Sequence, residues 1–202
     1  LRLRGFNRNN DGDWWRGWRV PAVIIESSRV LVASPESDSL HALDLRTGKR
    51  LWKIPRQLGL FLAGADDRQA IIVERYQVRS VDLKSGTTRW AARVGRPSGR
   101  GILTATQYMQ PLDVGVVAMV RLDDGTIRRT FPDETAALGS VSPIDSTRVI
   151  AQTFDRVVLL QGLESVRKEV EKRLRDKPND HNLLRQQGLL AREAGDFAAA
   201  QK

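Results

Sequence analysis

Short apolar segments, separated by polar turns rich in glycine and aspartate, follow one another along residues 19–160. Runs such as 20–25, 30–33 and 70–73 are four to six residues long and rich in valine and isoleucine. This length and the β-branched side chains are typical of strands rather than helices. The pattern predicts four short strands in each stretch of about forty residues.

The periodicity becomes helical near residue 161. The next apolar positions are three or four residues apart, at Leu163, Val166, Val170 and Leu174. Pro178 lies in the polar break at 177–180, where Asn179 or Asp180 can cap a following helix. We therefore expect a strand-rich domain at 1–160, a linker helix at 161–177 and the start of a helical repeat at 178–202.

One hairpin pattern recurs in the strand-rich part. Residues 40–52 read LHALDLRTGKRLW, 78–90 read VRSVDLKSGTTRW, and 117–131 read VAMVRLDDGTIRRTF. The glycines Gly48, Gly86 and Gly125 are 38 and 39 residues apart. A fixed period near forty residues, with four strands in each unit, is typical of the blades of a β-propeller.

The recurring residues fit a structural role. A compact hairpin loop usually needs positive φ, which glycine tolerates. Asp44, Asp82 and, less closely, Asp123 are placed to accept N–H bonds across the turn. We expect Trp52 and Trp90 to pack against a neighbouring unit.

A fourth unit is incomplete. Its strands are expected at about 136–141, 149–153 and 157–160, and the helical pattern begins where a fourth strand would follow. The sequence thus predicts a mainly β protein, a partial propeller of about three to four four-stranded antiparallel blades with a C-terminal α-helical extension.

Charge and composition narrow the classes of partner. The chain has 33 Lys and Arg against 24 Asp and Glu, a net charge of +9. Such a balance can favour nucleic acid or an acidic protein. Because the basic residues are scattered, and the densest run at 167–177 includes acidic residues, we expect no nucleic-acid binding. The absence of cysteine excludes disulfides and thiolate sites, and no apolar run is long enough for a transmembrane segment.

The first hairpin resembles the quinoprotein-type, or PQQ-like, propeller repeat, whose core is A-x-D-x-x-T-G-x-x-x-W. Ala42, Asp44, Thr47, Gly48 and Trp52 match all five positions. The resemblance covers roughly residues 19–160.

The later copies match less completely. The second retains Asp82, Gly86 and Trp90, with serine in place of the alanine and the threonine. In the third copy only Gly125 is in register, and Phe131 lies two residues beyond the tryptophan position.

The resemblance implies a binding role. Families with this repeat include periplasmic scaffold proteins of outer-membrane assembly in bacteria, whose propellers bind other proteins. We therefore expect a non-catalytic protein-interaction scaffold in the bacterial periplasm or cell envelope, with protein partners and no cofactor. The alternative is a segment of a PQQ-dependent quinoprotein dehydrogenase. Such enzymes commonly carry a vicinal cysteine pair, which this chain lacks.

The C-terminal residues resemble the start of a tetratricopeptide repeat. Gly188, Gly195 and Ala200 lie at spacings that this helix–turn–helix repeat uses for close packing. One such repeat cannot bury its own apolar face, so we expect further repeats beyond residue 202. The chain also begins with Leu1 rather than Met, and both observations lead us to expect a segment of a longer protein.

Catalytic motifs find little support in the sequence. His41 and His181 lie in different segments, which predicts no histidine-based dyad. The stretch 95–101, GRPSGRG, lacks the Lys-Ser/Thr of a phosphate-binding loop. We interpret it as a connection between blades, in which Arg96 and Arg100 form a possible interaction loop for an acidic partner.

Overall fold

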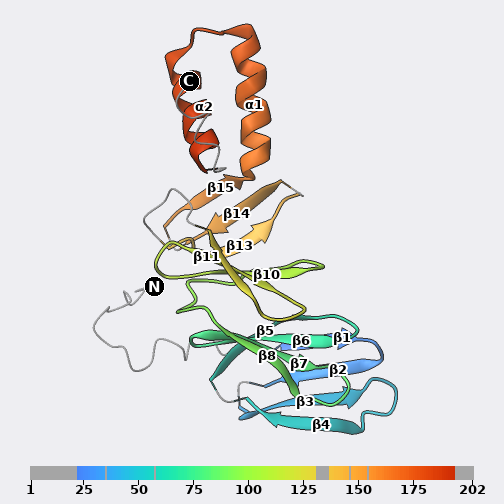
Figure 1. The fold of residues 1–202 in the computed structure, drawn as a ribbon. Helices are drawn as coiled ribbons and strands as arrows, with labels where there is room; N and C mark the ends of the chain where they lie inside the picture. The colour runs from blue at the N-terminus through green and yellow to red at the C-terminus, as the bar shows by residue number, and fades with distance from the viewer. Residues whose placement is uncertain are drawn as a thin grey trace, which may run out of the picture. The chain divides into compact units, whose positions relative to one another are not determined.

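A computed structural model describes residues 22–34, 36–56, 58–130, 137–145, 147–153 and 155–193. In these residues, strands β1 to β15 are followed by helices α1 and α2 (Figure 1). The chain divides into two compact units, one up to Val141 and the other from Ser142 on.

Three four-stranded antiparallel sheets build the first unit, and in each the strands pair in the order of the sequence. The first blade contains β1 (Ala22–Glu26), β2 (Arg29–Ala33), β3 (Ser39–Asp44) and β4 (Arg50–Pro55). The second blade contains β5 (Gly59–Ala65), β6 (Gln69–Glu74), β7 (Gln77–Asp82) and β8 (Thr88–Arg93). The third blade contains β9 (Ile102–Leu103), β10 (Gln107–Pro111), β11 (Val117–Arg121) and β12 (Ile127–Thr130).

Burial along the strands follows from the stacking of the blades. Every residue of β6 is buried, because the second blade has a neighbouring blade on each face. In β1 partly buried residues alternate with exposed ones, as they do when one face of a sheet is covered. Among the described residues, the second blade is therefore covered on both faces and the first blade on one.

Two apolar cores lie between successive blades. The core between the first two includes Leu31, Leu40 and Trp52 from one blade and Ile72 and Val81 from the next. The largest members of the core between the second and third blades are Leu60, Phe61, Ile71, Trp90, Tyr108 and Leu122. Strand β5, the first of its sheet, contacts the first strands of both neighbouring blades, β1 and β9.

The last sheet has three strands, in the order β13 (Ser140–Pro143), β14 (Arg148–Gln152) and β15 (Val157–Gln161). Helix α1 (Leu163–Asp176) begins two residues after β15 ends, where a fourth strand would otherwise follow. The predicted class, a mainly β partial propeller with a helical extension, is confirmed.

The two helices pack against each other, and Val170 of α1 is buried. Helix α2 (His181–Glu193) begins directly after Asp180, whose Oδ1 accepts N–H bonds from Asn182 and Leu183. Asp180, one of the two predicted capping residues, therefore caps this helix.

Strand β5 continues through a glycine. Gly64 and Ala65 still pair with Ile71 and Ala70 as part of this strand. Two register shifts along this pairing let the strand accommodate extra residues, which the spacing of apolar positions alone does not reveal.

Candidate functional site

The repeated turn has the same backbone geometry in all three blades. Gly48, Gly86 and Gly125 have φ of +68°, +75° and +75°. In each turn the glycine N–H donates to the carbonyl oxygen four residues earlier, at 2.9, 2.8 and 3.0 Å. Positive φ explains why glycine recurs at this position.

In the first two blades an aspartate closes the turn. Asp44 Oδ1 accepts the Thr47 backbone N–H and the Thr47 hydroxyl, each at 2.7 Å. Asp82 Oδ1 accepts the same pair from Ser85, each at 2.9 Å. These bonds favour the charged form, and so they lower the pKa of both carboxyl groups.

The third turn differs at this position. Arg121 occupies the place of the aspartate, four residues before Gly125. Asp123, which the sequence suggested for the turn role, instead forms an ion pair with the Arg121 guanidinium. Asp124 Oδ1 accepts the Thr126 N–H at 2.9 Å.

The two repeated tryptophans join one blade to the next. Trp52 is 8% exposed, and its Nε1–H donates to the Leu83 carbonyl oxygen at 3.0 Å. Trp90 is 9% exposed and donates to the Leu122 carbonyl oxygen at 2.9 Å. Each indole therefore reaches the turn of the following repeat.

The turn glycines complete the tryptophan contact. A Cβ added at Gly86 would lie 2.9 Å from the Trp52 ring, and one at Gly125 would lie 2.8 Å from the Trp90 ring. Such distances are too short for a real side chain, so glycine is needed here for close approach as well as for φ. The tryptophan of each repeat thus contacts the turn glycine of the next repeat, so the joint between two blades uses residues of both repeats.

A β-bulge directs each tryptophan into this joint. In the first blade Leu43 pairs with Arg50, but the next pair is Ala42 with Trp52, so one residue of β4 is skipped. The second blade shows the same shift between Ser80 and Val81. A bulge re-aims the side chains that follow it.

The third blade lacks the tryptophan, and its described residues also lack the bulge. Residues 127–130 of β12 pair one for one with β11. Arg129 follows Gly125 at the tryptophan spacing. Phe131, the aromatic residue proposed for this copy, lies outside the described residues.

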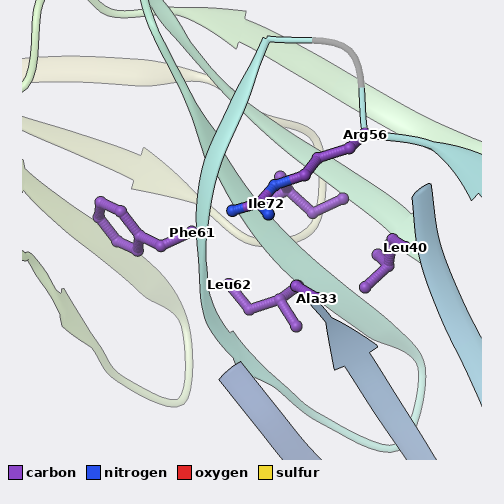
Figure 2. Close-up of a pocket in the computed structure, with 6 residues that line it drawn as sticks. All are labelled: Ala33, Leu40, Arg56, Phe61, Leu62 and Ile72. Carbon is purple, nitrogen blue, oxygen red and sulfur yellow. The ribbon is translucent and has the colours of Figure 1, made fainter. Parts of the chain in front are cut away.

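A buried arginine lies at the junction of the first two blades. Arg56 is 3% exposed and donates to the carbonyl oxygens of Ser34, Gly59 and Leu60 at 2.9, 3.1 and 2.7 Å. Figure 2 shows its side chain reaching into a small crevice that is otherwise lined by apolar residues. Because its donors face backbone oxygens, Arg56 joins the blades instead of offering a charge to a ligand.

A buried ion pair lies inside the second blade. Glu74 is 1% exposed, and its Oε1 accepts the Arg79 Nε–H at 2.6 Å. Its other oxygen accepts a bond from Gln77 Nε2. Both carboxylate oxygens of Glu74 therefore accept hydrogen bonds from side chains of the same sheet.

The sequence did not indicate that Arg56, Glu74 and Arg79 are buried. Arg56 lies four residues after Trp52, and Val94 lies at the same distance after Trp90. Because this position is charged in one repeat and apolar in the next, the repeat pattern does not predict whether its side chain carries a charge.

The connection at 95–101 is held firmly between blades. Pro97 forms an isolated bridge with Leu112, and the Ser98 N–H donates to the Pro111 carbonyl oxygen at 3.0 Å. Gly99 lies against Gly139, so close that an added Cβ would be 2.0 Å from its backbone. This supports its interpretation as a connection between blades.

The two arginines of this connection have different surroundings. Arg96 Nε lies 3.7 Å from Asp113 Oδ2, in a half-exposed ion pair. Arg100 is exposed, and its guanidinium carbon lies 5.2 Å from the centroid of the Phe61 ring. Arg100 is therefore the more accessible of the two predicted interaction residues.

The helical-repeat residues are only partly described. Gly188 lies in α2 and is half-buried, whereas Gly195 and Ala200 lie outside the described residues. Neither α1 nor α2 combines the length and apolar character that crossing a membrane requires. Within the described part of the chain, no three acidic or histidine side chains gather as metal ligands would.

The comparisons with known proteins agree on the fold. No family model matches the sequence, and no curated protein matches it. Among solved structures, BamB from Moraxella catarrhalis is similar with a TM-score of 0.56 and 17% identity, over 69% of this chain and 45% of that one.

Two further similar structures come from different sources. The computationally designed Ika4 protein has a TM-score of 0.56 and 11% identity, over 71% of this chain and 91% of its own. The C-terminal WD40 domain of Sif2 has a TM-score of 0.54 and 13% identity, over 69% of this chain and 42% of that chain.

These likenesses show a β-propeller fold and nothing finer. The chain spans less than half the length of the BamB and Sif2 chains it matches.

Proposed function

We propose that this chain is a non-catalytic scaffold that binds other proteins. The observation that carries the proposal is the use of the repeated polar and aromatic side chains. Asp44 and Asp82 hold turns, and Trp52 and Trp90 join blades. Because these residues serve the fold, the connections between strands are left to make contacts with a partner, as loops on a rigid framework commonly do.

The proposed partner is an acidic protein surface. The net charge of the whole chain, +9, favours association with an acidic surface. Arg100 places an exposed guanidinium on a connection whose backbone is fixed by the bonds of Ser98 and Val141. A fixed cation of this kind contributes to orientation and to the rate of association.

The helices supply a second surface in this proposal. Leu184 and Leu189 of α2 are exposed, although α2 already packs against α1. We interpret the helix pair as the beginning of a tetratricopeptide-like array and the blades as PQQ-like repeats. The five matches at residues 42–52 support the second assignment.

The proposed place of action is the bacterial periplasm or cell envelope. The proposal rests on the PQQ-like resemblance, because this repeat occurs in periplasmic scaffolds. Fractionation of the producing cells is the direct measurement. Recovery of the protein only with the cytoplasmic fraction would contradict it.

Site-specific cross-linking tests the scaffold proposal. We would place the photo-reactive residue p-benzoylphenylalanine at the exposed position 140, where the Ser140 hydroxyl accepts the Arg100 backbone N–H, and, as a control, at the exposed position 51 of β4. This leaves the Arg100 guanidinium in place. We expect discrete protein adducts from position 140 only, and a decrease of these adducts at high salt because screening weakens contacts between exposed charges. Equal adduct patterns from both positions would contradict a specific interface at the connection.

An enzyme assay tests the non-catalytic part of the proposal. The purified chain would be incubated with pyrroloquinoline quinone, calcium and either an alcohol or a sugar. We expect no oxidation above that of the cofactor alone. Turnover of either substrate class would support a quinoprotein dehydrogenase and overturn the scaffold proposal.

A further inference from the structure

The two ends of the second and third blades carry different kinds of turn. At one end the turns consist mainly of polar residues and glycine, as at 66–68, 84–86, 104–106 and 123–125. At the other end, where the connection at 95–101 lies, Leu58, Tyr76 and Val114 are 48%, 48% and 68% exposed. Reversal of the chain requires no large apolar side chain, so these three residues need another explanation.

Backbone hydrogen bonds hold the turns of this end side by side. The Gly95 N–H donates to the Tyr76 carbonyl oxygen at 3.2 Å, and the Asp113 N–H donates to the Arg96 carbonyl oxygen at 3.0 Å. The turn that contains Val114 is thus two hydrogen-bonded steps from Tyr76, or about 10 Å at the usual spacing of paired strands.

Leu58 is joined to the same group of turns. The Arg75 N–H donates to the Leu58 carbonyl oxygen at 3.2 Å, and Arg75 precedes Tyr76 in the turn between β6 and β7. The three apolar side chains therefore gather on one end of the blades. Exposed apolar groups that gather within a polar surrounding are typical of a binding surface.

Arginines surround these apolar side chains. Arg93 ends β8, and Arg96 and Arg100 lie in the connection that follows it. Arg93 and Arg100 are exposed, while Arg96 is half-exposed beside Asp113. Glu74, the other carboxylate of these turns, is buried in its ion pair. The cations therefore outnumber the accessible carboxylates at this end of the second and third blades.

The first blade sets a limit to the positive region. Glu36 and Asp38 are exposed in its connection between β2 and β3, which lies at the same end of the strands. The combination of arginines and exposed apolar side chains is therefore confined to the second and third blades and to the connection that leads to the second.

The combination of side chains indicates the chemistry of the ligand. Tyrosine and arginine are enriched at the centres of protein interfaces. Guanidinium groups bind carboxylates through paired hydrogen bonds. The aliphatic groups of Leu58 and Val114 favour a protein over a nucleic acid, because most contacts to nucleic acid are polar contacts to phosphate and sugar.

We propose that this end of the blades binds an acidic protein segment in which a large apolar side chain lies between carboxylates. The apolar side chain contacts Tyr76 and Val114, and the carboxylates pair with Arg93 and Arg100. The inference rests on the proposed scaffold function and extends its interface from one arginine to a surface, the loop surface, made of Leu58, Tyr76, Arg93, Arg96, Arg100 and Val114.

Three fluorescein-labelled peptides test the chemistry of the ligand with the full 202-residue chain. The first is Glu-Asp-Glu-Phe-Glu-Asp-Glu, the second has alanine in place of phenylalanine, and the third has glutamine and asparagine in place of the acids. We expect fluorescence anisotropy to show at least about tenfold tighter binding of the first peptide than of the other two, as the loss of a central interface residue typically gives.

Substitutions in the protein should separate the two kinds of contact. Tyr76→Ala should weaken binding of the phenylalanine peptide about tenfold and leave binding of the alanine peptide unchanged, because only the first peptide has the side chain that Tyr76 contacts. Arg93→Gln should weaken binding of both acidic peptides by a similar factor. Leu51→Ala and Lys53→Gln, at exposed positions of β4, are the matched controls and should leave both affinities unchanged.

The substituted side chains are exposed, so the fold should tolerate these changes. An unchanged midpoint of urea denaturation in each variant would confirm this. Val114→Ser provides a second apolar change on a different turn, and it should weaken binding of the phenylalanine peptide in the same direction as Tyr76→Ala.

Several outcomes would overturn the proposal. One is equal binding of the phenylalanine and alanine peptides, and another is an equal effect of Tyr76→Ala and Leu51→Ala. Tighter binding of oligothymidylate or of phosphatidylserine vesicles than of the first peptide would assign the surface to another polyanion. If Arg100→Gln weakens binding but Tyr76→Ala and Val114→Ser do not, the loop surface is wrong, while the scaffold proposal keeps its interface at the connection.

Discussion

The two junctions between described blades share one contact and differ in another. In both, an indole lies on the turn glycine of the next blade and donates to a carbonyl oxygen. Four residues after the tryptophan, however, the first junction has Arg56 bonded to three carbonyl oxygens, whereas the second has the buried Val94.

This difference shows which residues of the junction the repeat requires and at which position it accepts different side chains. A tryptophan on a glycine fixes the spacing of two blades, so both members must be kept. The space beside them can be filled by an apolar side chain or by a cation that is bonded to backbone oxygens, since either avoids an unpaired buried charge. Four substitutions test this separation, from the largest expected effect to the smallest.

Trp90→Ala should have the largest effect. It removes a buried aromatic side chain and leaves the Leu122 carbonyl oxygen without its indole donor. We expect the free energy of unfolding to fall by about 3–5 kcal/mol, as truncation of buried aromatics does. Urea denaturation followed by circular dichroism is the measurement. Trp90→Phe keeps most of the packing and should cost less, and a near-neutral Trp90→Ala would show that the joint is not needed for stability.

Arg56→Met should cost about 2–4 kcal/mol in the same assay. Methionine keeps the length of the side chain but removes every donor to the oxygens of Ser34, Gly59 and Leu60. Val94→Ala, the contrasting change at the second junction, removes only apolar contacts and should cost about 1–2 kcal/mol. If Arg56→Met is the milder of the two, the cation is a tolerated residue rather than a necessary one.

Gly125→Ala should cost about 2–3 kcal/mol, through strain at positive φ and collision with Trp90. The two causes can be separated by repeating the change in a Trp90→Leu background. There the ring is absent, and we expect only the strain, about 1 kcal/mol. The same cost in both backgrounds would mean that φ alone requires this glycine.

Asp82→Asn should have the smallest effect, and it should depend on pH. The Ser85 N–H and hydroxyl lower the folded-state pKa of Asp82. The carboxylate therefore stabilises the fold above its unfolded-state pKa of about 4, and this contribution is lost as pH falls through the lower folded-state pKa.

The melting temperature at neutral pH should therefore decrease by about 1–3 °C in Asp82→Asn. Below about pH 4 the difference from the unmodified chain should shrink, since both side chains then become neutral. A difference that grows on acidification would contradict the assignment of this turn.

The sequence predicted the propeller class because its main signals are local. Turn glycines, β-branched runs and the change to helical spacing near 161 can each be read within a few residues. The solved propellers similar to this chain confirm the class. The same local reading predicted a helix cap at Asn179 or Asp180, and the structure shows that Asp180 is the cap.

The remaining features depend on residues that are distant in sequence. The acceptor of the Trp52 indole is 31 residues away, and the oxygen of Ser34 that binds Arg56 is 22 residues away. The bulge between β3 and β4 arises from the pairing of the two strands, and no residue type in the sequence marks it. The predicted interaction residues Arg96 and Arg100 were placed on a connection by composition, but only the structure shows that Asp113 engages the first.

In each joint the tryptophan is synthesised before the turn glycine that it contacts, and this order has a consequence during translation. Trp52 leaves the ribosome 34 residues before Gly86, and Trp90 leaves 35 residues before Gly125. At about 5–20 residues per second, each indole therefore waits roughly 2–7 s for its acceptor. We expect a nascent chain from which Trp52 but not Leu83 has emerged to show a water-exposed Trp52, and one from which Gly86 has also emerged to show it buried, so the blades would close in order from the N-terminus.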